Sequence, residues 1–324
     1  MRALVCKDFA PYKNLTVEEA PEPPLGEGMV MLDVKAAGVN FPDILLVEGN
    51  YQMKPPTPFV PGMEAAGVIS DLGEKVQGVK EGDRVIAATM MGAFAEKVPV
   101  HFSQVVPMPE SMSFEEGAAL TTIYGTSYHA LKDRARLKEG DTVLVLGAAG
   151  GVGIATVQLA KAMGAKVIAA ASSDEKLQFC RDNGADETIN YTTEDLKARV
   201  KELTGGKGVD VVYDPVGGDY AEPALRATGW DGRYLVIGFA SGPIPKIPLN
   251  LALLNSRNIQ GVFWGAWAGQ NPRDNAKNLK EIFDFYEAGK IKPQVSASYK
   301  LEDYAKAFED LLERRVKGKV VLTP

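Results

Sequence analysis

The stretch "VLVLGAAGGVG", residues 143–153, is an apolar run that ends in a cluster of glycines. The dinucleotide-binding fingerprint G-x-G-x-x-G lies between a strand and a helix. Ala148 stands at its first position here, and Gly150 and Gly153 occupy the other two. The helical sequence "GIATVQLAKAMG" follows, ending at a glycine that suits a C-cap. The stretch therefore predicts a strand, a glycine turn and a helix.

Each position of this turn has a different physical role. Backbone N–H groups at a helix N-terminus bind a pyrophosphate, and a side chain at Gly150 would block that approach. Gly153 allows helix and strand to pack closely, whereas Ala148 adds only a methyl group at the tight turn. The alternative is a plain turn whose glycines serve packing alone. The residues expected to hold the phosphates are Ala149, Gly150, Gly151, Val152 and Gly153.

Short β-branched runs alternate with helical patterns from residue 142 to about residue 264. The expected strands are "TVLVLG", "KVIAAA", "ETINY", "GVDVVYD", "GRYLVIGF" and "NIQGVFW". Helical segments begin near Gly151, Asp174, Thr193 and Tyr220, and the fifth connection is rich in proline. Strands that are apolar throughout and joined by helices indicate a parallel sheet covered on both faces. The fold class is therefore α/β, with a Rossmann-type doubly wound parallel sheet.

The flanking sequence has a different texture. Before residue 120, strand-like pieces alternate with Gly/Pro-rich turns, which predicts a mostly β domain. After residue 272 come two amphipathic helices, each followed by a strand. Because this last piece has no sheet of its own, we expect it to return to the N-terminal domain. The predicted domains are 1–122 with 268–324, and 123–267. The residues expected to face inward are Leu279, Ile282, Phe283 and Tyr286 in the first helix, and Tyr304, Ala307, Phe308, Leu311 and Leu312 in the second.

Composition excludes several classes of protein. The chain has 324 residues, enough for two domains, and a formal net charge of −6 with no long run of Lys and Arg. Nucleic acid is therefore not an expected partner. The sequence contains no run of eighteen apolar residues and no secretory signal, so we expect a cytoplasmic protein that does not enter a membrane. Cys6 and Cys180 are expected to be two separate thiols.

The end of the second predicted strand indicates which dinucleotide binds. An acidic side chain there would accept hydrogen bonds from a ribose 2′-OH, but this strand ends with Ala171 and Ser172. NADP is therefore favoured over NAD, with Lys176, Ser172 and Tyr191 expected to meet the 2′-phosphate. Asp174 lies near the usual distance for a ribose ligand. Residues 172–175 match a capping box, however, which would place Asp174 in the first turn of the next helix.

Five motifs follow one another along the chain: "AAGVNFPDILLVEGNY" (36–51), "FVPGMEAAGVI" (59–69), "VQGVKEGDRV", "GAAGGVG" and "VVYDPVGG". In this order they resemble the medium-chain dehydrogenase/reductase superfamily. The resemblance covers essentially the whole chain. It implies a GroES-like N-terminal domain beside the Rossmann domain.

The resemblance also implies what is missing. The zinc alcohol dehydrogenases of this superfamily carry a Cys where this chain has Asn40 and a His where it has Met63. Neither replacement ligates zinc well, and two cysteines cannot build the four-cysteine lobe of those enzymes. We therefore expect a metal-free protein, with Glu64 serving as a buried hydrogen-bonding residue or N-cap partner. His101 and His129 are expected to be structural.

Without zinc, oxidation of an alcohol is disfavoured, because the metal makes the alkoxide accessible near neutral pH. Hydride transfer to an electrophilic acceptor, such as a quinone or an α,β-unsaturated carbonyl, remains feasible. The sequence most resembles the zinc-independent quinone oxidoreductase (zeta-crystallin-like) branch. The expected function is an NADPH-dependent, metal-free reduction of such acceptors. An enoyl thioester (enoyl-CoA/ACP) reductase and a non-catalytic NADPH-binding protein remain alternatives.

The resemblance implies roles for residues around the nicotinamide. Asn40, Asp43 and Tyr51 would line that end, with Tyr51 as proton donor and Asn40 donating its amide to substrate or to the nicotinamide carboxamide. Asn40 could instead bond loop backbone, and Tyr51 could be a packed turn residue. Other residues expected near the nicotinamide are Thr126, Gly238, Phe239 and Ser241.

Two further features concern the surface. Trp264 and Trp267 could face the acceptor pocket, or could belong to the core or a subunit contact. The resemblance implies that the sixth strand pairs across a dimer axis, which predicts a homodimer without an exposed sheet edge.

Overall fold

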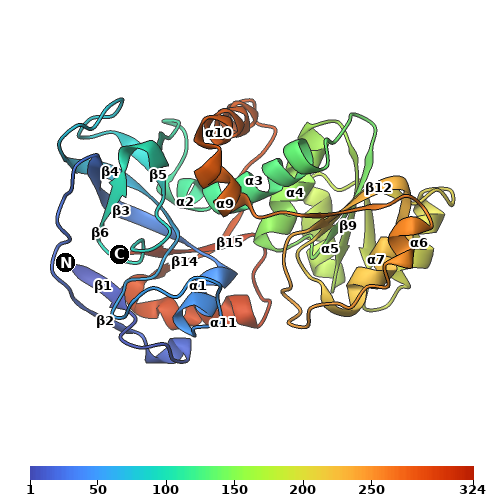
Figure 1. The fold of residues 1–324 in the computed structure, drawn as a ribbon, viewed down its shortest axis with the longest axis horizontal. Helices are drawn as coiled ribbons and strands as arrows, with labels where there is room; N and C mark the ends of the chain where they lie inside the picture. Colours follow the sequence, from blue (N-terminus) through green and yellow to red (C-terminus); the bar gives the residue numbers. More distant parts are fainter. The chain divides into compact units, whose positions relative to one another are not determined.

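The computed structural model describes residues 1–324 and divides into two compact units. Unit 1 comprises Met1–Thr122 and Pro293–Pro324, and unit 2 comprises Ile123–Lys292. Both chain termini lie in unit 1 (Figure 1). None of the helices combines the length and apolarity needed to cross a membrane.

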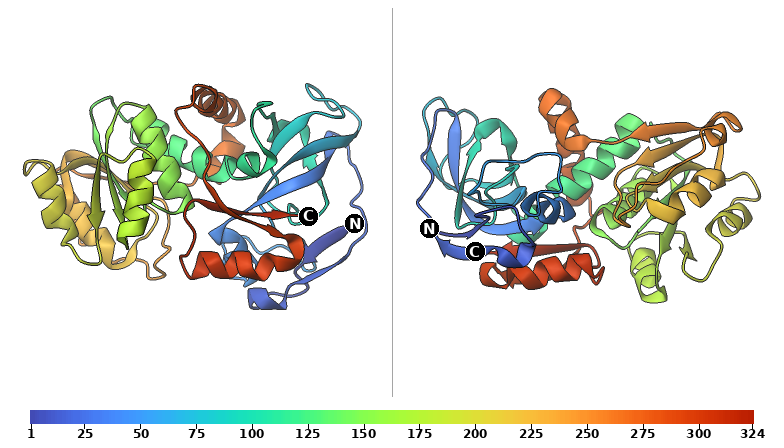
Figure 2. Two further views of the ribbon diagram at one scale, coloured as in Figure 1. Left: turned by 180° about the vertical axis from the view of Figure 1, so that it is seen from behind. Right: turned by 60° about the horizontal axis from the view of Figure 1, so that its bottom comes forward.

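Unit 2 is built on a six-stranded parallel sheet in the order β10-β9-β8-β11-β12-β13. The chain proceeds outward from β8 to β10, then resumes at β11 beside β8 and proceeds the other way, as in a doubly wound fold. Helices lie on both sides of this sheet (Figure 2), which confirms the predicted fold class. The strands are β8 (Thr142–Leu146), β9 (Lys166–Ala171), β10 (Glu187–Asn190), β11 (Val209–Asp214), β12 (Thr228–Val236) and β13 (Asn258–Gly261).

The central strands of unit 2 are apolar because both of their faces are covered. All four residues 143–146 of β8 have no exposed surface, and Val167–Ala170 of β9 are equally buried. The helices of this unit are α4 (Gly151–Ala162), α5 (Asp174–Asp182), α6 (Leu196–Leu203), α7 (Ala221–Ala227), α8 (Asn250–Leu253), α9 (Trp264–Gln270) and α10 (Pro272–Glu287). Helix α3 (Thr121–Tyr128) leads into the unit and continues as a π-helix over His129–Arg134.

Unit 1 is mostly β, in agreement with the GroES-like prediction. Its main sheet runs β14-β15-β3-β4-β5-β7, with β6 paired to β3, and a separate ladder joins β1 to β2. The strands are β1 (Arg2–Val5), β2 (Thr16–Glu19), β3 (Met29–Val39), β4 (Glu64–Leu72), β5 (Arg84–Ala88), β6 (Lys97–His101), β7 (Val105–Pro107), β14 (Val295–Lys300) and β15 (Lys319–Thr323). The helices are α1 (Phe41–Val47), α2 (Phe114–Ala118) and α11 (Tyr304–Leu312).

The C-terminal β-α-β piece completes the sheet of unit 1, as predicted. Strand β15 pairs antiparallel with β3 through Val320–Leu322, and β14 adds to β15 in parallel. Helix α11 buries Tyr304, Ala307 and Phe308. The prediction that Leu312 faces inward is wrong, because 41% of its surface is exposed at the last position of the helix.

The chain leaves unit 2 and returns to unit 1 after Lys292, whereas the sequence predicted this boundary at residue 268. Helix α10 accounts for most of the residues between these two boundaries. It is held by hydrogen bonds to α3 and to the π-helix that continues it. Asn278 donates to Asp133, and Glu281 accepts from the hydroxyl of Tyr128 at 2.5 Å. These bonds keep residues 268–292 with unit 2.

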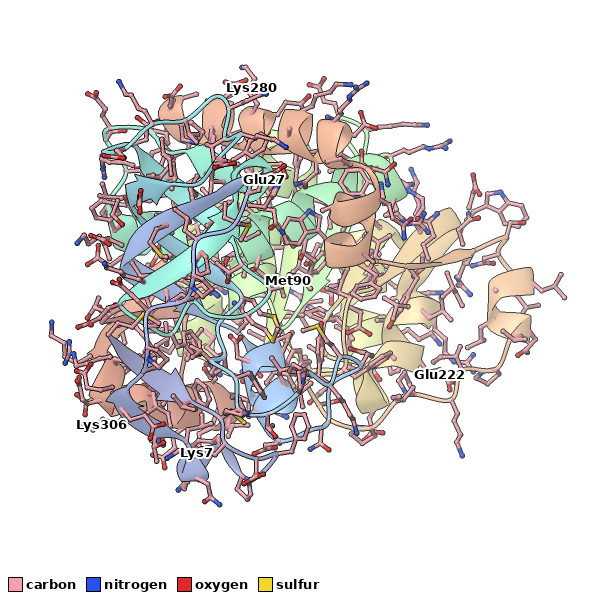
Figure 3. The ribbon with its side chains drawn as sticks, turned by 60° about the vertical axis from the view of Figure 1, so that its left-hand side comes forward. Lys7, Glu27, Met90, Glu222, Lys280 and Lys306 are labelled. Carbon is pink, nitrogen blue, oxygen red and sulfur yellow. The ribbon has the colours of Figure 1, made fainter.

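The surface of both units carries charges of either sign. Lys280 on α10 and Lys306 on α11 point outward (Figure 3), and each pairs with a carboxylate on or beside its own helix. Such exposed pairs contribute little to stability. The fold therefore depends on the two buried cores rather than on these pairs.

Candidate functional site

The glycine turn follows β8, where the sheet reverses its direction of growth. Gly147 has a φ of +56°, so the left-handed residue of the turn is this glycine and not Ala148. Ala148 itself is fully buried. This explains how the motif tolerates alanine at its first position, because the residue that must be glycine lies one position earlier.

The other two glycines differ in the space around them. A Cβ built at Gly153 would lie 2.3 Å from the Gly147 carbonyl oxygen, so α4 approaches the turn too closely for any side chain. A Cβ at Gly150 would meet only that same oxygen, at 3.4 Å. Gly150 is the N-cap of α4 and supplies no side chain to cap it. The first N–H groups of the helix therefore remain available to an anion.

The end of β9 gathers the residues predicted to meet a 2′-phosphate. The ammonium of Lys176 donates to the hydroxyl of Ser172 at 3.4 Å. The backbone N–H of Tyr191 donates to the carbonyl of Ala171, which brings the segment after β10 beside the end of β9. The structure thus brings Ser172, Lys176 and Tyr191 to one corner of the sheet.

Asp174 lies in the first turn of α5, as expected, and its carboxylate accepts from Asn190 at 3.0 Å. The prediction that the capping box of this helix begins at Ser172 is wrong. Ser173 is the N-cap, and its hydroxyl accepts from the N–H of Lys176. Ser172 lies between the end of β9 and this N-cap. Asp174 is therefore occupied as a partner of Asn190, which fits the interpretation that it is not the ribose ligand.

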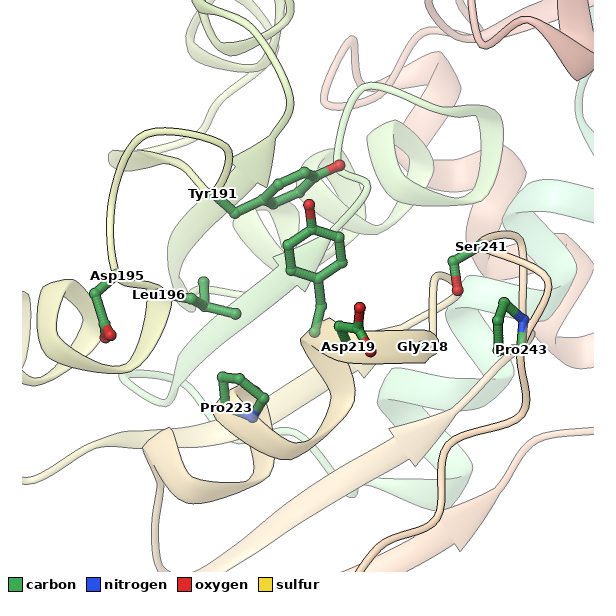
Figure 4. A pocket seen from close by; sticks show the side chains of 9 residues that line it. Tyr191, Asp195, Leu196, Gly218, Asp219, Pro223, Ser241 and Pro243 are labelled. Atoms are coloured by element: carbon green, nitrogen blue, oxygen red, sulfur yellow. The ribbon is translucent and has the colours of Figure 1, made fainter.

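A cavity of about 410 Å³ opens beyond the carboxyl ends of β10, β11 and β12 (Figure 4). The rings of Tyr191 and Tyr220 meet on one of its walls, with centroids 4.4 Å apart. Ligands of doubly wound sheets bind beyond these strand ends. The residues that line the cavity are Tyr191, Asp195, Leu196, Gly218, Asp219, Tyr220, Pro223, Ser241 and Pro243.

The loop after β12 contains the predicted nicotinamide residues Gly238, Phe239 and Ser241. It packs on the loop after β11, since a Cβ at Gly217 would lie 2.9 Å from the Phe239 ring. The Ser241 hydroxyl oxygen is buried without a hydrogen-bond partner. Thr126 lies inside α3 and is half-buried.

The two tryptophans belong to helix α9, not to a strand, because β13 ends at Gly261. The Trp264 ring lies against Gly125, and its N–H donates to Asn275 at 3.0 Å. Trp267 stacks on the buried ring of His129, with centroids 4.1 Å apart. Both are therefore packed within unit 2, and His129 is structural, as predicted.

The predicted residues of unit 1 lie in a buried polar cluster that the sequence did not fully reveal. The Asn40 amide donates to Glu64 at 2.9 Å and to the Gly38 carbonyl at 3.3 Å. Lys319, only 3% exposed, donates to the Asn40 oxygen at 2.8 Å, to Glu64 at 2.7 Å and to the Val39 carbonyl at 2.9 Å. Both hydrogens of the Asn40 amide are thus used within the protein, which contradicts its predicted role as a donor to a bound molecule.

Glu64 joins this cluster to the start of α3. One carboxylate oxygen accepts from Asn40 and Lys319, and the other accepts from the N–H of Thr122 at 2.8 Å. The carboxylate has no exposed surface. The prediction that Glu64 is a buried hydrogen-bonding residue or an N-cap partner is therefore confirmed, and it serves as both.

Asp43 lies in the first turn of α1 and is fully buried. One of its oxygens accepts from the N–H of Asn40 at 2.7 Å, and the other has no hydrogen-bond partner. Burial raises the pKa of Asp43 from 3.8 to about 7, against the opposing effects of the Asn40 N–H and of Lys319. The cluster therefore contains a carboxyl group that holds its proton close to neutral pH.

Tyr51 follows α1 in an irregular segment and is half-buried. Burial and the nearby charge of Asp43 both raise the pKa of its phenol. The phenol therefore remains protonated at neutral pH, which is the state that a proton donor requires.

Comparison with known proteins identifies the family. The model described as "Alcohol dehydrogenase GroES-like domain" matches residues 26–110, and the model described as "Zinc-binding dehydrogenase" matches residues 151–283. The quinone oxidoreductase-like protein 2 of Rattus norvegicus is 40% identical over 323 residues, which cover 99% of this chain and 92% of the rat protein. The chain belongs to the zinc-independent quinone oxidoreductase branch of the medium-chain dehydrogenase/reductase superfamily.

Solved structures agree with this assignment to the quinone oxidoreductase branch. The Escherichia coli quinone oxidoreductase complexed with NADPH superposes with a TM-score of 0.93 at 31% identity, and the match covers all of both chains. A mycobacterial protein, also complexed with NADPH, gives the same TM-score, identity and coverage.

One of the two matching families is described as zinc-binding, which raises the question whether side chains of this chain could ligate a zinc ion. No group of three or more His, Cys, Asp and Glu side chains is placed to hold a metal ion. The Glu64 carboxylate already pairs with the Lys319 ammonium, and Asn40 and Met63 are poor zinc ligands. The residues present do not fit a zinc ion.

Proposed function

We propose that this protein is an NADPH-dependent oxidoreductase that delivers a hydride to quinones or α,β-unsaturated carbonyl compounds. The observation that carries the proposal is the arrangement at the strand ends of unit 2. The glycine turn, the Ser172–Lys176–Tyr191 corner and the loop 238–241 all lie beyond the carboxyl ends of one parallel sheet. The NADPH complexes of two relatives support the choice of cofactor.

Each part of the cofactor is assigned to residues of unit 2. The N-terminus of α4, at Gly150 to Gly153, would hold the pyrophosphate, since this helix has no side-chain cap. Lys176 would pair with the 2′-phosphate, helped by the hydroxyls of Ser172 and Tyr191. Bound NADPH supplies the hydride.

The residues of unit 1 are assigned to the acceptor. Hydride addition to the β-carbon of an enone places negative charge on the carbonyl oxygen, and the α-carbon then takes a proton. Tyr51 is the proposed proton donor, because its phenol is half-buried and stays protonated at neutral pH. Asn40 and Asp43 are the proposed neighbours of the acceptor.

A screen of NADPH oxidation over several electrophiles tests the proposal. We expect 1,4-naphthoquinone or an enone such as crotonaldehyde to accelerate NADPH oxidation well above the buffer rate, and NADH to be oxidised more slowly. A preference for enoyl-CoA would favour the enoyl thioester reductase alternative. Tight binding of NADPH without oxidation by any acceptor would favour a non-catalytic NADPH-binding protein.

The assembly and location belong to the same proposal. Strand β13 forms an edge of the sheet of unit 2, and Ile259 on it is 42% exposed; Leu253 and Leu254, in the segment before the strand, are also exposed. An open parallel edge with apolar side chains suits pairing with a second copy, so we propose a homodimer. Light scattering after gel filtration would show it, and Ile259→Lys should shift the protein toward monomer. The two free thiols, Cys6 and Cys180, favour a cytoplasmic location.

A further inference from the structure

The cation of the buried cluster in unit 1 has no assigned role. A lysine is rarely buried, yet Lys319 is 3% exposed and each of its three donors has an oxygen partner within 2.9 Å. Burying an ammonium carries a large desolvation cost that pairing alone often fails to offset. Apolar residues of similar volume in place of both Lys319 and Glu64 would often stabilise a fold equally well. The retained charge therefore points to a role beyond stability.

The hydrogen bonds show what this charge does to Asn40. An amide group can turn by 180° with little change in shape, and its oxygen and nitrogen then exchange places. Here the oxygen faces the Lys319 ammonium, while the nitrogen faces the Glu64 carboxylate and the Gly38 carbonyl. A turned amide would aim N–H groups at the ammonium and its oxygen at the carboxylate. Only one orientation satisfies every group.

We propose that Lys319 is a positioning residue that locks the Asn40 carboxamide with both hydrogens directed into the protein, so that Asn40 can offer a bound molecule only a hydrogen-bond acceptor. The Asn40 oxygen accepts from the Lys319 ammonium and also faces the N–H of Asp43 in the capping box of α1, so toward a bound molecule it can act only as an acceptor. The group of substrate or cofactor that meets it must then carry an N–H or O–H, as a carboxamide or a phenol does. This consequence rests on the proposed function, but the lock itself does not.

The lock can be tested without any turnover. In the protein without NADPH, we expect the two Asn40 side-chain amide protons to exchange slowly with solvent, because both are buried and hydrogen-bonded. Lys319→Met removes the charge at similar volume and should accelerate this exchange at least tenfold. NMR of ¹⁵N-labelled protein measures it, with Asn40→Asp identifying the signal. Lys300→Met, an exposed lysine on the adjacent strand β14, is the matched control.

Enzyme kinetics supply a second test, because a purely structural role of Lys319 would leave the pH profile of kcat unchanged. Asp43 is faced by Lys319 from β15, Glu64 from β4, the N–H of Asn40 and the Tyr51 phenol. Lys319 lowers the pKa of Asp43, so Lys319→Met should shift to higher pH any limb of the pH profile of kcat that the Asp43 proton sets. Lys319→Arg, which keeps the charge, should leave that limb in place.

Each outcome decides the proposal. Wild-type exchange of the Asn40 protons in folded Lys319→Met would overturn it, whether or not the protein reduces any electrophile. If Lys319→Met does not fold, the double variant Glu64→Gln with Lys319→Met removes both charges together and should fold with fast exchange. Wild-type exchange in that variant would also overturn the lock. Failure of both variants to fold would assign Lys319 to stability alone and reject the proposal.

Discussion

The two units hold their candidate functional groups in opposite ways. In unit 2 the key features belong to the backbone, namely a left-handed Gly147, an uncapped helix start at Gly150 and a close approach at Gly153. In unit 1 they belong to side chains, and Asn40 and Lys319 already bond to other groups of the protein. The start of α4 has no side-chain cap, whereas the hydrogens of Lys319 and of the Asn40 amide are all bonded within the protein.

This contrast predicts different responses to mutation. A backbone site tolerates changes in nearby side chains but fails when a Cβ enters the turn. A buried side-chain cluster fails when one member is removed, because a desolvated partner remains unpaired. Four measurements test this difference between the units.

Asp43 should give the largest effect. Its folded pKa of about 7 lies above the ordinary 3.8, so the folded protein binds this proton more tightly than the unfolded chain does. The resulting stabilisation is complete below about pH 4 and is lost as the pH rises through about 7. Between pH 5 and pH 8, the free energy of unfolding of the wild type should fall by about 3 kcal/mol relative to Asp43→Asn. Urea unfolding across this range measures the difference.

The control for this measurement is Asp284→Asn, which removes an exposed carboxylate on α10. Its difference from the wild type should be nearly independent of pH, since exposed pairs contribute little. A constant difference for Asp43→Asn as well would show that the cluster does not hold a proton near neutrality.

Tyr51→Phe tests whether unit 1 contributes a reacting group. An enolate carbon needs a delivered proton, whereas a hydroquinone can take its protons from solvent. The variant should therefore slow enone reduction by about 100-fold, within the range of general acid catalysis, and slow quinone reduction by less than about threefold. Steady-state rates with crotonaldehyde and 1,4-naphthoquinone measure this. Equal losses with both acceptors would reject Tyr51 as the acid.

Two glycine variants separate packing from ligand approach in unit 2. Gly153→Ala places a Cβ against the Gly147 oxygen and should destabilise the fold by about 2 kcal/mol. Gly150→Ala meets no such obstacle, so it should keep the wild-type Tm and yet weaken NADPH binding. Calorimetry and fluorescence titration measure the two effects. A stable Gly153→Ala that binds normally would contradict the assigned packing role.

The sequence predicted the sheet of unit 2 well, because every strand and most helices left a local signature. Runs such as "TVLVLG" and "KVIAAA" are apolar only where a strand is covered on both faces. The errors fell at ends of elements, where neighbouring residues satisfy the same pattern. Ser172 and Ser173 both fit an N-cap, and "VFW" fits a strand although Trp264 opens a helix.

The buried cluster was only partly predictable, because its members are distant in sequence. Asn40 and Glu64 belong to recognisable motifs, but Lys319 lies 255 residues after Glu64 and begins an ordinary apolar strand. A lysine at that position usually faces solvent. Its role depends on the return of β15 to the side of β3, a pairing that the sequence predicted without its register.

Lys176→Ala should give the smallest effect, because it removes one charge from a site whose other proposed contacts, backbone N–H groups and the hydroxyls of Ser172 and Tyr191, remain. The Lys176 ammonium lies beside the Ser172 hydroxyl at the end of β9, where a 2′-phosphate is expected. Loss of one charge-assisted hydrogen bond should raise the Kd for NADPH about tenfold, or about 1.4 kcal/mol, and leave the Kd for NADH unchanged. Lys201→Ala, an exposed lysine on α6, is the control. Equal weakening for both cofactors would mean that Lys176 does not recognise the 2′-phosphate, and the preference for NADPH would then require another cation.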